Sequence, residues 1–302
     1  MSQNIKFFLI SFLVSIPLWW GINVFEKDLE DFFFVQYYQP SPQVFLAQAL
    51  PRSHQNLEKE TPEIAAVSAI SVKIDKRGQQ KILFEKNSEK ILPIASLTKL
   101  MAASVVLENY DLSQELMVSK KAIGQPEAFG QLRIGEKLSV ENLLYLILIE
   151  SSNDAAFALS ELIGEGGFVE LMNLEAKYLG LKNTHFADPA GYSPENYSTV
   201  KDLVKFTKYL LEEKPQILEI SRLSEFDLYD PDGVFHHKLL NTNEILGEIP
   251  EIIGGKTGYT TEAGECFILV LKNPRDNSIL INIILGSRNR FEEMQKLIDW
   301  LY

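Results

Sequence analysis

The sequence has one cysteine and four histidines among its 302 residues. Cys266 therefore has no partner for a disulfide within the chain, and a cysteine-based zinc site would need more thiolates. The histidines are scattered apart from His236-His237, which we interpret as a loop or a strand end, whereas zinc requires three or four converging ligands. The sequence predicts no metal site and no cofactor.

Positive charge is also scarce, because Lys and Arg number 29 against 41 Asp and Glu, for a formal net charge of −12. A phosphate backbone would be repelled by this excess of carboxylates rather than neutralised. The short basic clusters are mixed with Asp and Glu, as on an ordinary solvated surface. We therefore expect no nucleic-acid partner.

Charge is absent altogether from the apolar stretch Phe7–Phe25. At 1.5 Å per residue, about 19 helical residues span about 28 Å, enough to cross a bilayer core. Lys6 precedes the stretch and Glu26 follows it, an asymmetry that predicts the rest of the chain outside the cytoplasm. A cleaved signal peptide is the alternative, but the small-x-small segment Ala47–Ala49 lies far beyond the apolar run. We expect residues 1–25 to be a membrane anchor.

Residues 26–61 are acidic and proline-containing and are typical of a linker, so the folded domain is expected over 62–302. Its periodicity predicts a hairpin, a mainly helical middle, three further strands and a closing helix. The expected elements are strands at 68–75 and 81–86, a helix from about 96, helices within 113–215, strands at 252–260, 265–272 and 278–287, and a helix at 291–301. This order predicts an α+β fold, with one antiparallel sheet flanked by helices and an all-helical lobe inserted.

The segment Ser96-Leu97-Thr98-Lys99 places an amine one helical turn from a hydroxyl. Serine is a poor nucleophile unless a nearby base takes its proton. Lysine can be that base only if burial or a neighbouring cation lowers its pKa, and Lys256 could supply the cation. An isolated Ser-x-x-Lys is expected about once by chance in a chain of this length. A second match, Ser198–Lys201, is better explained as helix capping by Thr199 and Asp202.

Two further motifs follow. Ser151-Ser152-Asn153 lies between two predicted helices, where Ser151 could relay a proton and Asn153 could hold Lys99 and a substrate amide. This pattern is weak alone, since Ser2-Gln3-Asn4 also matches it. The triplet Lys256-Thr257-Gly258 occurs in a glycine-rich predicted strand, with which an extended peptide could pair while the lysine and threonine meet a carboxylate.

The three motifs in this order resemble those of the D-alanyl-D-alanine carboxypeptidases, the low-molecular-mass penicillin-binding serine peptidases. The resemblance covers about residues 62–302. The similar segments are Pro93–Met101, Ser151–Ala156, Thr184–Tyr192, Asn241–Asn243, Gly255–Thr260 and Ala263-Gly264. It implies a β-lactamase/transpeptidase-like fold and a bacterial cell-envelope enzyme. Together with the anchor predicted from the apolar stretch, we expect attachment to the cytoplasmic membrane through the N-terminal helix, with the catalytic domain outside.

The resemblance also implies a role for each candidate residue. Ser96 would be the acylated nucleophile and Lys99 its base, while Ser151 and Asn153 would assist proton transfer and positioning. The terminal carboxylate of the substrate would be bound by residues of the triplet strand, and the oxyanion by the N–H groups of Ser96 and the residue after the triplet. The substrate-binding residues are Lys256, Thr257, Gly258 and Tyr259. The substrate would be a peptidoglycan stem peptide ending in D-Ala-D-Ala, and β-lactam antibiotics would acylate Ser96 as its mimics.

Three alternatives stay open. A D,D-endopeptidase that cuts peptide cross-links would carry the same motifs. A class A-like β-lactamase would need a glutamate ahead of a Leu-Asn pair, but Leu240-Asn241 has His237 at that position. A catalytically silent penicillin-binding sensor would not need all three motifs intact.

Overall fold

The computed structural model describes residues 61–126 and 130–302, which belong to one compact unit. The expected anchor at 1–25 lies outside the described residues, as does the expected linker except for residue 61, so both remain predictions. Within the described ranges, no helix combines the length and apolar character needed to span a bilayer.

A five-stranded sheet with the order β2-β1-β11-β10-β9 is the centre of the fold, and all its neighbouring strands are antiparallel. Its strands are β1 (Ser68–Ile74), β2 (Gln80–Lys86), β9 (Ile252–Thr260), β10 (Gly264–Lys272) and β11 (Ile279–Ser287). The chain returns to complete the sheet, because β1 pairs with β11 in a register that sets Ile70 opposite Ile283. The predicted antiparallel sheet is confirmed, and β9 forms one of its edges.

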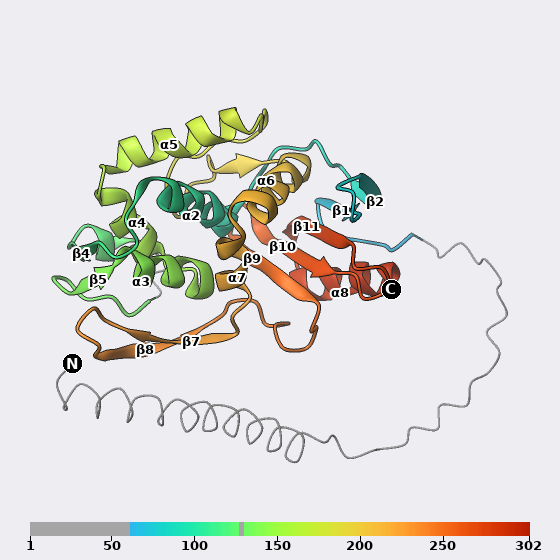
Figure 1. Ribbon diagram of the computed structural model, residues 1–302. Helices are drawn as coiled ribbons and strands as arrows, with labels where there is room; N and C mark the ends of the chain where they lie inside the picture. The colour runs from blue at the N-terminus through green and yellow to red at the C-terminus, as the bar shows by residue number, and fades with distance from the viewer. Residues whose placement is uncertain (1–60, 127–129) are drawn as a thin grey trace, which may run out of the picture. The chain divides into compact units, whose positions relative to one another are not determined.

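Helices cover both faces of the sheet (Figure 1), and a hydrophobic core lies on each face. On one face, α8 (Arg290–Leu301) packs against β10 and β11 through Met294, Leu297 and Ile298. The larger core lies on the other face, where α6 (Val200–Glu213) contacts β1 and β11 and α7 (Pro215–Ser221) contacts β9. Most of the sheet is therefore buried on both sides, and catalytic side chains can reach solvent only near its edge.

The helical lobe is built between β2 and the C-terminal strands. It contains α2 (Thr98–Asn109), α3 (Val140–Tyr145), the π-helical turn η3 (Leu146–Glu150), α4 (Asn153–Glu161) and α5 (Glu165–Tyr178), with short elements η1 (Ala95–Leu97), η2 (Ala122–Gly124), β3 (Leu92–Pro93), β4 (Glu115–Met117), β5 (Lys137–Ser139) and β6 (Tyr197–Ser198) around it. Local sequence sets several of these boundaries: Ser139 and Asn142 form a reciprocal capping box, and Thr199 caps α6 through the N–H of Asp202.

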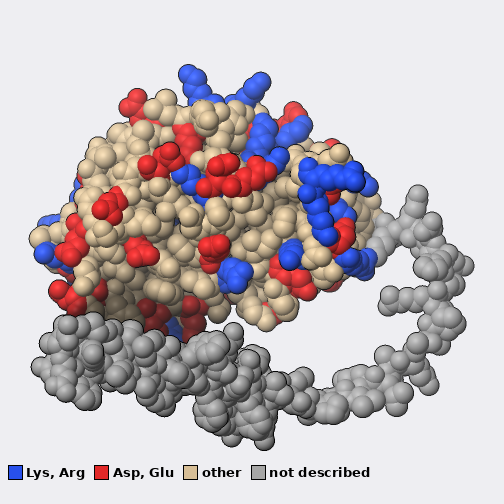
Figure 2. All heavy atoms as spheres, in the orientation of Figure 1, with Lys and Arg blue, Asp and Glu red and all other residues tan. Residues whose placement is uncertain are grey.

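A second hairpin, β7 (Glu225–Tyr229) and β8 (Phe235–Leu240), was not predicted. Its turn is held by Asp230, whose Oδ1 accepts the N–H groups of Asp232 and Val234. His236 and His237 lie in β8, so their interpretation as a strand end is confirmed in part. On the face shown in Figure 2, acidic and basic side chains are interspersed.

Candidate active site

The three sequence motifs meet at one cavity of about 460 Å³. They are distant in the sequence, since Lys256 lies 160 positions after Ser96. The cavity is lined by Ser96, Glu150, Ser151, Asn153, Thr242, Thr257, Gly258, Tyr259 and Arg290. Lys99 and Lys256 are buried, at 0% and 2% relative exposure, and are not among these lining residues. Every site residue predicted from the motifs therefore lies at the cavity or directly beside it.

Ser96 lies in η1, the 3-10 turn that leads directly into α2. Two glycines let other segments approach this turn closely. Gly191 has φ +86°, and a Cβ there would lie 2.0 Å from the carbonyl oxygen of Ala95. A Cβ on Gly258 would lie 2.9 Å from the backbone nitrogen of Ser96. Both the 191 loop and β9 thus reach the nucleophile only because these positions lack a side chain.

Lys99 Nζ has three oxygen neighbours: Ser96 Oγ at 2.8 Å, Asn153 Oδ1 at 2.7 Å and the carbonyl oxygen of Ala190 at 2.7 Å. The amide and carbonyl oxygens accept hydrogen bonds only, so each needs an N–H from the lysine. A protonated Lys99 would donate one N–H to each of the three oxygens, whereas a neutral Lys99 would donate to Asn153 and Ala190 and keep its lone pair for the hydroxyl of Ser96. In the neutral form the amine is therefore placed where it can take the proton of Ser96.

The two acceptors around Lys99 are themselves fixed. Asn153 Nδ2 donates to the carbonyl of Pro126 at 2.8 Å, which orients the amide with its oxygen toward Lys99. The Ala190 carbonyl belongs to a loop organised by Asp188, whose Oδ1 accepts the N–H groups of Ala190 and Gly191 at 2.8 and 2.6 Å. Both acceptors of Lys99 are therefore held in place by hydrogen bonds of their own.

Lys256 projects from β9 into the buried region beside Lys99. Its Nζ donates to the carbonyl of Thr257 at 3.1 Å. Burial lowers the pKa of Lys256 well below its ordinary value, and the positive charges of Lys99 and Arg290 lower it further. Because the repulsion between two buried amines is mutual, the pair of Lys99 and Lys256 favours the loss of a proton. The lowered pKa is that of Lys256 itself, so the expected role of Lys256 as the cation beside a Lys99 base stays a prediction.

The second half of β9 faces the cavity, whereas its first half is covered by α7. Gly255 N–H donates to Ser221 Oγ at 3.1 Å, and a Cβ on Gly254 would collide with Leu218. Beyond them, Thr257 Oγ1 lies 2.6 Å from Thr242 Oγ1, and Tyr259 is 53% exposed. An extended peptide could therefore pair with β9 from Thr257 onward.

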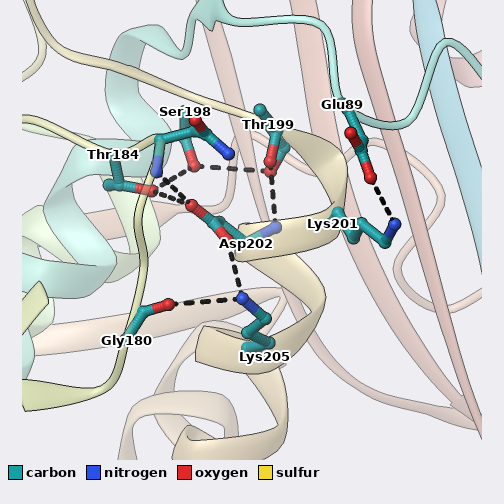
Figure 3. Close-up of polar contacts among 9 residues, drawn as sticks. Glu89, Gly180, Thr184, Ser198, Thr199, Lys201, Asp202 and Lys205 are labelled. Atoms are coloured by element: carbon teal, nitrogen blue, oxygen red, sulfur yellow. Dashed lines mark hydrogen bonds and ion pairs between the residues drawn. The ribbon is translucent and has the colours of Figure 1, made fainter.

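The second Ser-x-x-Lys segment has a different environment (Figure 3). Ser198 is fully buried, with its Oγ 2.7 Å from Thr184 Oγ1, while Lys201 points away and pairs with Glu89 at 2.6 Å. Thr199 Oγ1 accepts the N–H of Asp202, so the predicted capping role is confirmed. The other weak match, residues 2–4, lies outside the described residues.

Two cavity residues, Glu150 and Arg290, were not predicted from the sequence, and Thr242 was identified only as part of the similar segment Asn241–Asn243. Arg290 Nη1 donates to the carbonyl of Gly258 at 3.1 Å, which ties the start of α8 to the triplet strand. Glu150 directly precedes Ser151 of the second motif. None of the three belongs to a motif of its own, and only the folded chain brings them together.

Side chains that could ligate a metal are spread through the fold rather than gathered. Across residues 61–126 and 130–302, no group of three or more His, Cys, Asp or Glu side chains is arranged to hold a metal ion. Cys266 is buried in β10, and burial raises the pKa of its thiol to about 12, which disfavours a reactive thiolate.

Residues 55–289 match the family model of the D-alanyl-D-alanine carboxypeptidases. The chain belongs to this family. D-alanyl-D-alanine carboxypeptidase DacF of Bacillus subtilis is 32% identical over 255 residues, covering 81% of this chain and 64% of the relative. The D-alanyl-D-alanine endopeptidase of Escherichia coli is 29% identical over 265 residues, covering 85% of this chain and 84% of the relative. The chain thus spans just under two thirds of DacF but most of the endopeptidase.

Solved structures of penicillin-binding proteins share the fold. Penicillin-binding protein D2 from Listeria monocytogenes, in its cefotaxime-bound form, matches with a TM-score of 0.69 and 30% identity over 80% of this chain and 98% of that one. The Streptomyces K15 DD-transpeptidase matches with a TM-score of 0.71 and 26% identity over 80% of this chain and 98% of that one. The predicted β-lactamase/transpeptidase-like α+β fold is confirmed.

Proposed function

We propose that the protein is a serine-type D-Ala-D-Ala carboxypeptidase that acts on peptidoglycan stem peptides through an acyl-enzyme on Ser96. The observation that carries the proposal is the contact of 2.8 Å between Lys99 Nζ and Ser96 Oγ, beside two oxygens that can only accept hydrogen bonds. Membership of the carboxypeptidase family supports the same reaction.

In the acylation step, Lys99 takes the hydroxyl proton while Ser96 Oγ forms a bond to the carbonyl carbon between the two D-alanines. The negative charge that develops on the carbonyl oxygen is stabilised by the N–H groups of Ser96 and Tyr259. As the C–N bond breaks, the proton held by Lys99 passes through Ser151 to the leaving amine. Water then attacks the ester carbon and gives a proton to Lys99, which passes it to Ser96 Oγ as the ester C–O bond breaks, and the shortened peptide leaves with a new carboxyl end.

The terminal carboxylate of the substrate binds at the β9 side of the cavity. Thr257 and Arg290 line this side, and the Thr257 hydroxyl is held by Thr242. Lys256 is buried behind the cavity lining, and its Nζ donates to the carbonyl of Thr257, so it supports this side of the cavity from within the fold. Gly258 lets β9 lie against Ser96, and Asn153 holds both Lys99 and the substrate amide.

β-Lactams acylate Ser96 as mimics of the same dipeptide. Structural relatives that contain cefotaxime or ampicillin support this part of the proposal. A peptidoglycan substrate places the catalytic domain in the bacterial cell envelope, and attachment to the cytoplasmic membrane through residues 7–25 is the finer part of the proposal, resting on the sequence alone.

Cross-link cleavage is a second candidate function, because three relatives carry the name D-alanyl-D-alanine endopeptidase and one of them is covered over 84% of its length. The two activities share the acylation step and differ in the leaving group, which is a free D-alanine or the amine of a neighbouring stem peptide.

The test is to incubate the full chain in detergent with a stem pentapeptide and, separately, with a cross-linked dimer, and to weigh the products by mass spectrometry. The proposal predicts loss of one D-alanine from the pentapeptide by the wild type and none by the Ser96→Ala variant. Cleavage of the dimer alone would assign the endopeptidase activity instead. Equal turnover by both proteins would refute the acyl-enzyme on Ser96.

A further inference from the structure

Four ionisable side chains form a continuous hydrogen-bonded chain that ends at the cavity. His236 Nε2 lies 3.1 Å from Glu136 Oε2, the two imidazoles meet through their Nδ1 atoms at 2.5 Å, and His237 Nε2 lies 3.1 Å from Glu150 Oε2. All four side chains are 8–18% exposed. We call this series the Glu–His–His–Glu chain. It links the loop before β5 to the hairpin β7–β8 and to the end of η3.

The number of protons in this chain follows from its geometry. Each of the three contacts joins two electronegative atoms and needs one hydrogen between them. Two neutral imidazoles carry only two N–H protons, and two ionised carboxylates carry none. The arrangement is therefore satisfied by three protons shared over the four groups, which gives the chain a net charge of −1. With two protons its charge is −2, and one carboxylate or ring nitrogen faces a lone pair.

Among the residues that the structure describes, the Lys and Arg side chains of the surrounding elements do not form ion pairs with Glu136 or Glu150 in place of this third proton. On the hairpin, the exposed Lys238 pairs with Glu225 and Asp227 of β7. Lys137, next to Glu136, lies near Glu115 of β4. The remaining titratable groups on the surrounding elements are Arg133 beside Glu136, Tyr229 on β7, Glu141 and Tyr145 on α3, and Arg290 at the cavity. In the described residues, the ion pairs of Glu136 and Glu150 are made with the two imidazoles.

Glu150 matters because it directly precedes Ser151 and shares the cavity with it. Ser151 has φ +65° and ψ +31°, a left-handed conformation that is costly for a residue with a side chain. Such a conformation persists only where the surrounding structure holds it. Glu150 helps to fix the backbone at Ser151, because its own side chain is held at both oxygens. Its Oε2 contacts His237, and its Oε1 accepts the N–H of Leu240 at 3.4 Å.

We propose that His237 is a positioning residue for Ser151, acting through Glu150, and that the Glu–His–His–Glu chain performs this role only while it holds its third proton. The inference rests on the proposed function, because it assigns Ser151 to the transfer of a proton during acylation or release. Imidazole is the side chain that ordinarily changes its charge between pH 5 and 8. Raising the pH removes the shared proton, loosens Glu150 and slows the reaction at Ser96.

The first test compares the pH dependence of acylation by a chromogenic cephalosporin for the full-length wild type and two variants. His237→Gln keeps an N–H donor for Glu150 but cannot titrate, and His185→Gln is the matched control because His185 is an exposed histidine. We expect the wild type and His185→Gln to lose acylation rate by about 2- to 10-fold on one alkaline limb, the size of one hydrogen bond. His237→Gln should lack that limb. The same limb in all three proteins would overturn the proposal.

The second test counts the protons without relying on acylation. Nitrogen NMR of protein labelled with ¹⁵N-histidine, assigned with His236→Gln and His237→Gln, should show three ring protons on this pair at pH 5.5 and two at pH 9. Two protons at both pH values would refute the shared proton. A wild type that no β-lactam acylates would refute the proposed function and the role assigned to His237, while the NMR result would still decide the proton count.

Discussion

Two segments of this chain share the pattern Ser-x-x-Lys, yet their surroundings differ in every respect that matters for nucleophilic catalysis. In the first, Lys99 is fully buried, its Nζ lies 2.8 Å from Ser96 Oγ, and Ser96 opens onto a cavity. In the second, Ser198 is fully buried, and Lys201 is 47% exposed and paired with Glu89. The serine and the amine are therefore together in one segment and separated in the other.

The difference lies in what the rest of the fold brings to each segment. Lys99 contacts Asn153 from the helical lobe and the Ala190 carbonyl from a loop, and β9 brings the buried amine of Lys256 close to it. Lys201 meets only a surface carboxylate, an interaction that is worth little in water. Spacing within a helix makes a serine and a lysine neighbours, but burial and tertiary contacts decide whether the lysine becomes a base.

The sharpest test of this comparison exchanges each serine for alanine. Ser96→Ala should abolish covalent labelling by a fluorescent penicillin, because it removes the cavity hydroxyl that Lys99 Nζ contacts. Ser198→Ala should keep full labelling and lose about 1 kcal/mol of stability, since it removes a buried hydrogen bond to Thr184. Labelling that survives in Ser96→Ala would place the nucleophile elsewhere.

Exchange of each lysine for arginine should have the next largest effect. Guanidinium cannot accept a proton at ordinary pH, so Lys99→Arg should reduce the acylation rate by about 10²- to 10⁴-fold, the usual contribution of a general base. Lys201→Arg should acylate normally, because arginine can still pair with Glu89. Stopped-flow measurement with a chromogenic cephalosporin compares the two, and normal acylation by Lys99→Arg would contradict the assignment of the base.

The close approach of β9 distinguishes the first segment from the second and can be tested at Gly258. In Gly258→Ala the new Cβ would lie 2.9 Å from the nitrogen of Ser96, so the strand or the nucleophile must shift. We expect acylation to fall by about tenfold or more, as for the displacement of an oxyanion donor. Gly166→Ala is the control, because a Cβ at that position would have no neighbouring atom within 4 Å. Equal rates in both variants would argue against this packing.

The smallest expected effect is on the free energy of unfolding, which the burial of Lys256 beside Lys99 should lower. The depressed pKa of Lys256 means that, between this value and 10.5, the unfolded chain binds more protons than the folded one. The free energy of unfolding of the wild type should therefore rise with pH toward 10.5. Lys256→Met should be more stable by on the order of 1 kcal/mol at neutral pH and show a flatter pH profile.

Lys201→Met serves as the control for that measurement, because Lys201 is an exposed cation with an acidic partner. Its unfolding should show the same pH profile as the wild type above neutral pH when followed by circular dichroism in urea. A Lys256→Met variant that is less stable than the wild type, with an unchanged pH slope, would show that the buried amine is stabilising.

Much of this architecture could be predicted from the sequence because its signals are local. Alternating or continuous apolar residues predicted β9, β10 and β11 to within two residues, and Thr199 with Asp202 predicted the start of α6. The motif residues were likewise predicted, since each motif keeps its chemically active residues within four positions of one another.

The parts that escaped prediction depend on contacts between distant segments. The Ala190 carbonyl is a backbone atom with no signature in the sequence, and the similar segment Thr184–Tyr192 gave no indication that it contacts Lys99. Arg290 and Glu150 are common residue types with no motif around them, and they reach the cavity because α8 begins at Arg290 after β11 and η3 ends at Glu150. The hairpin β7–β8 was missed because its strands are short and half-exposed.

The most direct test of the central claim locates the covalent adduct in the wild-type chain. After reaction with benzylpenicillin and digestion with trypsin, mass spectrometry should find the adduct on the peptide of residues 91–99, at Ser96. An adduct on the peptide of residues 183–201, which contains Ser198, would contradict the claim that burial and tertiary contacts, rather than the Ser-x-x-Lys pattern, select the nucleophile.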